Sequence, residues 1–202
     1  MRHWQKNGMV DSENGPRRAG MEVYWGEIGP VDHAVQIYAD QTLFMDTLEG
    51  FASAGLRAGD GVIVIATTAH RIALERRLRI RGFDVDLARR EDRYTAVNAI
   101  AALSEFMIDG EPNEVQFICL ATHLIARAHG SGRRVRVFGE LVALLWGQRN
   151  IAATVALECL WNKLQAEETF CLFCAYPRSG FTQNTINSLH EICSHHSRQI
   201  PE

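Results

Sequence analysis

The sequence predicts an α/β fold, in which a three-layer α/β/α sandwich is built around a mostly parallel sheet. Segments with the apolar pattern of strands alternate with segments whose apolar residues recur at helical spacing, which favours helices on both faces of one sheet. The run from Val62 to Ile65 is β-branched throughout. Such a run is typical of a strand covered on both faces, and therefore of a parallel sheet.

Continuous or alternating apolar residues predict strands at 33–38, 62–66, 83–87, 134–138 and 169–176. We expect the segment 83–87 to be an edge strand, because its apolar and polar residues alternate strictly. Pro177 ends the last of these strands.

The first predicted helix follows Asp40, whose side chain can cap it, and stops at Gly55, which we expect to form a left-handed cap. Asn113 and Asn150 are candidate caps of later helices. The remaining helices are predicted at 69–81, 93–108, 114–129, 140–147, 151–166 and 182–194.

The length of 202 residues and the hydrophobic content of 47% suit one globular domain. Residues 11–18 are polar, contain turn formers and show no periodicity. We therefore expect residues 1–30 to be a flexible leader and residues 31–200 to form a single domain.

The net charge of −3 gives no support for electrostatic capture of nucleic acid, so no direct nucleic-acid binding is expected. No apolar run reaches the roughly 18 residues of a membrane span, and the first residues lack the apolar stretch of a secretory signal. The five cysteines are an odd number and lie mostly in apolar surroundings, which suits reduced thiols. These features predict a cytoplasmic protein without a membrane interaction.

The loops at the carboxyl ends of the strands of an open α/β sheet converge on one crevice. The segment 134–146 runs from a strand through Gly139 into a helix, and so places Glu140 on that rim. An apolar wall with a few polar groups is typical of a small-molecule site. We predict that the ligand-binding residues are His33, Tyr38, Thr67, His70, Glu140, Glu158, Trp161 and Tyr176.

An alternative stays open for the helix at 151–166. Glu158 and Asn162 are four residues apart and share a face beside Trp161. These residues could line the site, or Trp146 and Trp161 could fill the core while Glu158 pairs with a buried donor. A carboxylate in so apolar a helix needs a specific partner in either case.

The spacing of Cys171 with Cys174, and of Cys193 with His196, matches that of a zinc ribbon. However, the first pair lies within a predicted strand, whose alternation would point the two thiols to opposite faces. A zinc knuckle also needs a tight turn between its cysteines. We therefore expect no metal site and no cofactor.

Phosphate binding and catalysis find little support. The loop at 38–44 contains neither the glycines nor the lysine of a phosphate cradle, and Asp40 would repel an anion there. Histidines that could act as bases and a few possible nucleophiles occur, but none has the surroundings of a nucleophile elbow. They are His33, His70, His123, Cys119 and Ser131. No catalytic residue is assigned, and we do not expect an enzyme.

A series of segments, in this order, resembles the MEDS domain. This is the sensory domain of regulators from methanogens and methylotrophs, and the dichloromethane-responsive repressor is one of these regulators. The segments are His33–Tyr38, Gly55–His70, Phe106–Pro112, Arg136–Glu140, Leu157–Asn162, Cys174–Pro177 and Cys193–Ser197. Together they span nearly the whole chain after the leader.

The resemblance implies a fold related to the RecA-like and circadian-clock ATPases, with a degenerate P-loop at 38–44. Gly139 stands where those ATPases carry an acid for the metal, with Glu140 one place later. The corner at 67–70 also lacks the acid that activates water in them. These departures agree with the absence of a phosphate cradle.

The resemblance further implies a role in sensing small hydrocarbon derivatives. We therefore predict a non-enzymatic sensor domain for signal transduction in transcription regulation, which binds a small, largely apolar organic molecule at the carboxyl ends of the strands. A regulatory protein partner and a homodimer are expected. The alternative function is a ligand-free protein–protein interaction module derived from an inactive RecA-like ATPase.

Overall fold

The computed structural model describes residues 25–180, 192 and 194–201, and its centre is a six-stranded sheet. Every strand pair in this sheet is parallel, and the strand order is β3-β2-β6-β7-β1-β8. The strands are β1 (His33–Tyr38), β2 (Gly61–Ala66), β3 (Tyr94–Asn98), β6 (Val135–Gly139), β7 (Cys171–Pro177) and β8 (Arg198–Ile200). A short antiparallel pair, β4 (Met107–Ile108) and β5 (Glu111–Pro112), stands apart from it.

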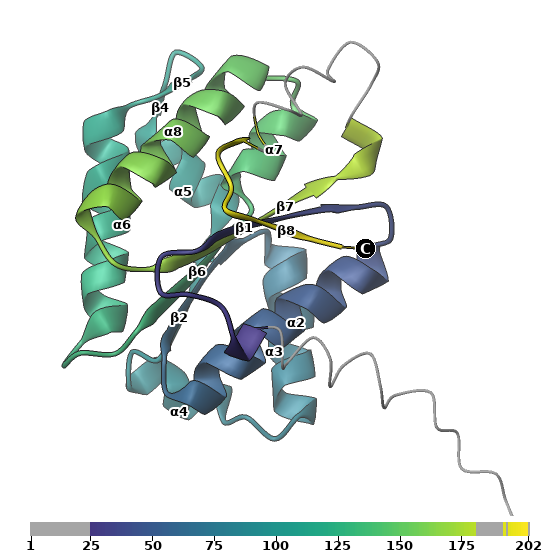
Figure 1. Ribbon diagram of the computed structural model, residues 1–202, viewed down its shortest axis with the longest axis vertical. Coiled ribbons are helices and arrows are strands. Elements are labelled where there is room, and N and C mark those ends of the chain that lie inside the picture. The colour runs from purple at the N-terminus through teal and green to yellow at the C-terminus, as the bar shows by residue number, and fades with distance from the viewer. Residues whose placement is uncertain (1–24, 181–191, 193, 202) are drawn as a thin grey trace, which may run out of the picture.

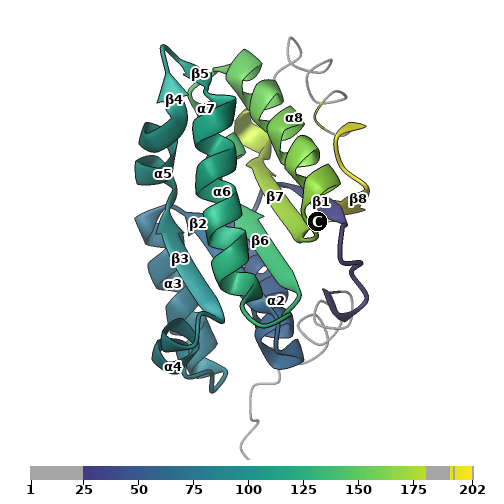
Figure 2. The ribbon, with the colours of Figure 1, turned by 90° about the vertical axis from the view of Figure 1, so that its left-hand side faces the viewer.

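Helices cover both faces of the sheet, as Figures 1 and 2 show, so the predicted three-layer arrangement is confirmed. One face carries α2 (Gln41–Ala58), α3 (Thr68–Ile80) and α4 (Val85–Arg90). The other face carries α5 (Ala99–Phe106), α6 (Glu114–His129), α7 (Leu141–Gly147) and α8 (Ile151–Glu167). A 3-10 turn, η1 (Arg178–Gly180), follows β7. In the described part of the chain, no helix is long and apolar enough to cross a bilayer.

Two hydrophobic cores, one on each face, follow from the strict alternation of side chains along the strands. In β7, Leu172, Cys174 and Tyr176 enter the core beneath α8. Cys171 and Phe173 enter the core beneath α2. The predicted separation of Cys171 from Cys174 is therefore confirmed.

The prediction that Gly55 ends the first helix is wrong. Helix α2 continues to Ala58, and Gly59, with a φ of 82°, provides the left-handed cap. Gly55 instead allows the helix to approach the sheet closely. A Cβ atom at this position would lie 2.8 Å from Arg136 Cδ and 2.8 Å from Val62 Cγ2.

The predicted edge strand at 83–87 is also wrong, and the helix predicted at 93–108 is present but shorter, as α5. Asp84 accepts a hydrogen bond from Leu87 N and so starts the short helix α4. The edge strand is β3 instead, and the helix after it begins only at Ala99, because Asn98 caps the N–H groups of the first turn of α5. The capping side chains of Asp84 and Asn98 thus set where α4 and α5 begin.

The packed part of the chain includes residues before Val31. Trp25 is fully buried, with its ring 4.9 Å from Phe51. Its carbonyl oxygen accepts a hydrogen bond from the buried Arg136, which also pairs with Asp60 at 2.7 Å. The remainder of the predicted leader and most of the helix predicted at 182–194 lie outside the described residues.

Candidate functional site

The structure places the predicted ligand-binding residues in two separate groups and leaves one apart. Tyr38, Thr67, His70 and Glu140 lie together at the carboxyl ends of β1, β2 and β6, and we call them the rim cluster. Glu158 of α8 meets His33 and Tyr176 on the other face of the sheet. Trp161 packs against Phe117 and Phe170, and among the described residues it contributes to neither network of polar contacts.

Glu140 organises the rim cluster. One oxygen of its carboxylate accepts a hydrogen bond from Thr67 N at 2.7 Å, and the other lies 2.8 Å from His70 Nδ1. These contacts put the negative charge at the start of α3, where the helix dipole favours an anion. Glu140 thus holds the backbone of Thr67 and the ring of His70 at the start of α3.

His70 carries the contact network to α2. Because its Nδ1 faces the Glu140 carboxylate and donates to it, its Nε2 is the acceptor for the side-chain amide of Gln41. The ring of His70 also packs edge-on against Phe44, with 5.1 Å between the ring centroids. The charge of Glu140, at the end of β6, is thereby linked to the first turns of both α2 and α3.

Tyr38 ends β1 and forms the aromatic part of the rim cluster. Its ring stacks on Phe44 with 4.6 Å between centroids and an interplanar angle of 15°. Burial of the phenol, with the negative charge of Glu140 as a second cause, raises the pKa of Tyr38 to about 12. The hydroxyl therefore stays protonated at neutral pH and can donate a hydrogen bond.

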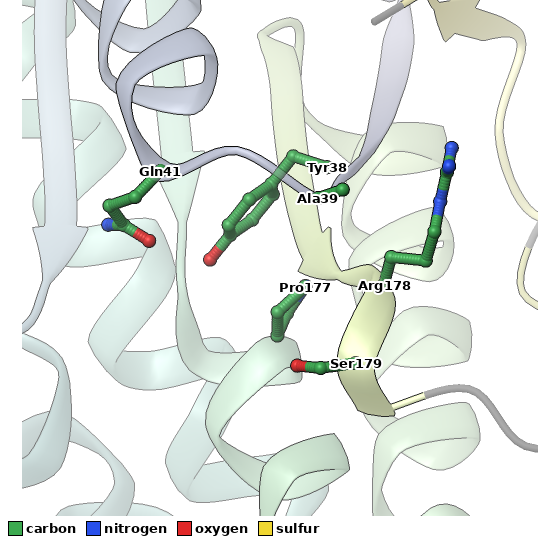
Figure 3. Close-up of a pocket in the computed structure, with 6 residues that line it drawn as sticks. All are labelled: Tyr38, Ala39, Gln41, Pro177, Arg178 and Ser179. Carbon is green, nitrogen blue, oxygen red and sulfur yellow. The ribbon is translucent and has the colours of Figure 1, made fainter.

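A cavity of about 410 Å3 opens beside Tyr38, between the ends of β1 and β7. Figure 3 shows the side chains of Tyr38 and Gln41 on one side of it and Pro177 and Ser179 facing them. Arg178 also lines the cavity, but its side chain extends away from Tyr38. The volume lies within the range of roughly 300–1,000 Å3 that is typical of small-molecule sites.

The start of α2 beside this cavity already has an anionic occupant. The Asp40 side chain accepts hydrogen bonds from Thr42 N at 2.6 Å and from Leu43 N at 3.3 Å. These are the N–H groups that a phosphate would use at a helix N-terminus. The geometry agrees with the sequence argument against a phosphate cradle in this loop.

The second group lies inside the protein, and we call its central residues, His33, Glu158, Cys174 and His196, the interior cluster. His33 Nε2 is 3.5 Å from Glu158 Oε2 and 3.5 Å from Cys174 Sγ. His196 Nε2 is 3.6 Å from Glu158 Oε1, and its ring centroid is 4.0 Å from that of His33. Among these groups, the Glu158 and His196 side chains have no exposed surface.

Burial shifts the titration of the interior cluster toward neutral forms. Loss of hydration raises the pKa of Glu158 to about 8, although the hydrogen bond that Tyr176 donates to its carboxylate opposes the shift. Loss of hydration lowers the pKa of His33 to about 4, and the hydrogen bond with Asn162 opposes that shift. Both histidines of the cluster are therefore neutral bases at pH 7, because burial also lowers the pKa of His196, to about 2.

Trp161 is a packing residue in the core beneath α8. Its ring stands at 89° to that of Phe117, with 4.8 Å between centroids, and it also packs near Phe170. A Cβ at Gly139 would lie 3.7 Å from the indole, which is an ordinary van der Waals contact. Trp161 therefore fills the core, as one of the two alternatives for this helix expected. Glu158 pairs with a buried donor, the hydroxyl of Tyr176, as the same alternative expected.

Sequence reasoning placed His33 and Tyr38 in one crevice, but the two residues belong to opposite ends and opposite faces of β1. It did not assign a role to Gln41, whose polar side chain in the first turn of α2 was the available signal. It grouped Cys174 and His196 with Cys171 and Cys193, whereas the structure joins them to His33 and Glu158. Cys193 lies outside the described residues.

Comparison with known proteins identifies the family. The family model described as MEDS, the MEthanogen/methylotroph, DcmR Sensory domain, matches residues 32–196. No curated protein and no solved structure matches the chain, so the relation to RecA-like ATPases stays a prediction. The family match covers all the strands from β1 to β7 and both clusters. The chain therefore belongs to the MEDS family of sensory domains.

Proposed function

We propose that this sensory domain detects a small, largely apolar organic molecule that binds in the cavity beside Tyr38, without chemical conversion of the ligand. The observation that carries the proposal is the position of this cavity at the carboxyl edge of a parallel sheet, where α/β proteins bind ligands. The match to a family of sensory domains supports the same role.

The cavity lining suits a molecule with an apolar body and one polar group. The Tyr38 ring, Ala39 and Pro177 offer apolar surface. The Tyr38 hydroxyl, the Gln41 amide and the Ser179 hydroxyl offer hydrogen bonds. Small haloalkanes and alcohols fit this combination.

The rim cluster offers a route by which binding would be signalled. Gln41 lines the cavity and contacts His70, which in turn contacts Glu140 at the end of β6. A ligand that takes the Gln41 amide as its own donor would remove it from His70. The rearrangement would alter the first turns of α2 and α3, and a regulatory protein partner would respond to that surface.

A thermal-shift experiment with a blocking variant tests this function. A ligand at about 100 times its Kd stabilises the folded state by about 2.7 kcal/mol, which raises the melting temperature of a chain of this size by about 5–10 °C. Haloalkanes, alcohols and ATP with magnesium would be screened. Ala39→Trp fills the cavity and should abolish the shift, whereas Ala101→Trp, at an exposed position of α5, should retain it.

Three outcomes count against the proposal. A shift with ATP and magnesium but with none of the organic molecules would indicate a nucleotide-binding domain. Equal responses of Ala39→Trp and Ala101→Trp would place the ligand elsewhere. The absence of any shift, together with capture of a protein partner by the unliganded domain, would favour the ligand-free interaction module.

A further inference from the structure

The interior cluster has the composition and spacing of a metal site. His33, Glu158, Cys174 and His196 each offer one ligand atom, and these atoms all lie within 4.8 Å of one another. Two imidazoles, a thiol and a carboxylate are the donors that zinc and related transition metals take from proteins.

The separations of His33 from Cys174 and Glu158 match those between ligands of a tetrahedral ion, and all four ligand atoms lie within 4.8 Å of one another. Zn–N and Zn–O distances near 2.0–2.1 Å and Zn–S distances near 2.3 Å imply ligand–ligand separations of about 3.3–3.6 Å. His33 Nε2 lies 3.5 Å from Cys174 Sγ and 3.5 Å from Glu158 Oε2. The His33–Glu158 contact is long for a hydrogen bond, while the thiol of Cys174 can donate to His33 Nε2 at 3.5 Å when no ion is bound; both separations suit ligands that share one ion.

Both histidines turn an unprotonated nitrogen toward the cluster. The Nδ1 atom of His196 lies 2.7 Å from the carbonyl oxygen of Ile192, which can only accept, so the ring proton is on Nδ1. His33 Nδ1 lies 2.9 Å from Asn162 Oδ1, whose amide nitrogen faces His195. A histidine that ligates a metal donates its other ring N–H to an oxygen in this way.

The lone pairs at the centre of the cluster lack donors. Within the part of the chain that the structure describes, Glu158 Oε2 and His196 Nε2 have no hydrogen-bond partner, although both atoms are buried. Leaving such groups buried and unsatisfied is costly, and a cation shared between them removes that cost. Tyr176 already donates to Glu158 Oε1, which leaves Oε2 to face the centre.

We propose that His33, Glu158, Cys174 and His196 bind one divalent first-row transition-metal ion, with Zn²⁺ as the reference ion. On binding, the Cys174 thiol and the Glu158 carboxyl release their protons to solvent, and the two groups ligate as thiolate and carboxylate. The ion joins β1, β7 and α8 to the segment that precedes β8. This site lies apart from the cavity beside Tyr38, and its existence does not depend on the proposed function.

Two cysteines of one strand provide a matched test on the full chain. Cys174 belongs to the cluster, whereas Cys171, three residues earlier and equally buried, faces the opposite core. The purified protein should bind one Zn²⁺ per chain, measured by elemental analysis after dialysis. Substitution with Co²⁺ should give a thiolate-to-cobalt charge-transfer band, which Cys174→Ser abolishes and Cys171→Ser retains.

A variant outside the ligand set guards against loss of folding. Asn162→Ala leaves all four ligands in place but removes the acceptor of His33 Nδ1, and should weaken Zn²⁺ binding by about 10–100-fold. Circular dichroism would establish that each variant is folded.

The alternative is a metal-free cluster in which a protonated Glu158 satisfies its neighbours. That state predicts no stoichiometric Zn²⁺ in the folded wild-type protein or in Cys171→Ser, a result that overturns the proposal. A charge-transfer band that survives in Cys174→Ser also overturns it, because another thiol would then be the ligand.

Discussion

Replacing Glu140 by glutamine isolates the charge that organises the rim cluster while keeping the side-chain volume. The carboxylate serves Thr67 N at 2.7 Å and His70 Nδ1 at 2.8 Å, and glutamine has only one oxygen to offer. One of the two donors must therefore face an NH2 group. Hydrogen bonds to charged groups contribute about 1.5–3 kcal/mol each, so we expect Glu140→Gln to lower the free energy of unfolding by about that amount.

The Glu140 side chain is only 9% exposed, so solvent screens the interaction little. For a chain of this size the loss corresponds to a fall in melting temperature of about 3–12 °C. Urea denaturation and calorimetry of wild type, Glu140→Gln, His70→Ala and the double variant form a double-mutant cycle. Direct contact predicts a coupling energy of about 0.5–3 kcal/mol between the two substitutions.

A matched cycle with His123→Ala provides the control, because His123 is exposed on α6, in the layer across the sheet. Its effect should add to that of Glu140→Gln within about 0.5 kcal/mol. If the His70 cycle were as additive as the His123 cycle, the contact between Glu140 and His70 would not contribute to stability. The proposed route from the cavity to Glu140 would then lose its physical basis.

Three further outcomes are expected. Gly55→Ala should lower the free energy of unfolding in urea titrations by about 1–3 kcal/mol, because the new Cβ meets Arg136 and Val62, and this outweighs the better helix propensity of alanine. The control Gly147→Ala should not lower it, because Gly147 has open space around it. Backbone hydrogen bonds from Thr42 and Leu43 lower the pKa of Asp40, so its stabilisation is present above the ordinary pKa of 3.8 and is lost as the pH falls below it; acid titration of Asp40→Asn should lack this component. Burial raises the pKa of Tyr38 to about 12, so the stability that its protonated phenol contributes is complete below pH 10 and is lost as the pH rises from 10 to 12. Tyr38→Phe should remove this loss from alkaline melting curves.

The sequence was sufficient for those elements whose signals are local and strong. The β-branched run of β2 and the helical periodicity of α6 and α8 place these elements within a residue or two of their observed ends. The errors fell where a single side chain decides between two weak preferences. Asn98 divides an apolar stretch into β3 and α5, and Asp84 turns an alternating stretch into α4.

The rim cluster was also accessible from sequence, because the carboxyl ends of parallel strands share one edge whatever their order. The interior cluster was not. It depends on β1 lying beside β7, which brings His33 to Cys174 across 141 positions of the chain, and on the segment before β8 folding back over β1. No periodicity or spacing within one element contains that information.

The position of β1 in the sheet also has a consequence for biosynthesis. Among the described strands, β1 pairs only with β7 and β8, which come from the last part of the sequence. Of the described strands, β1 comes first along the chain, so it has no partner until residues 171–177 have been made. Its backbone donors and acceptors stay open while the residues between β1 and β7 are made, and such sequence-distant pairing folds slowly. We expect this domain to complete its sheet only once residues 171–200 have been made, with the backbone of β1 open to wrong pairing until then.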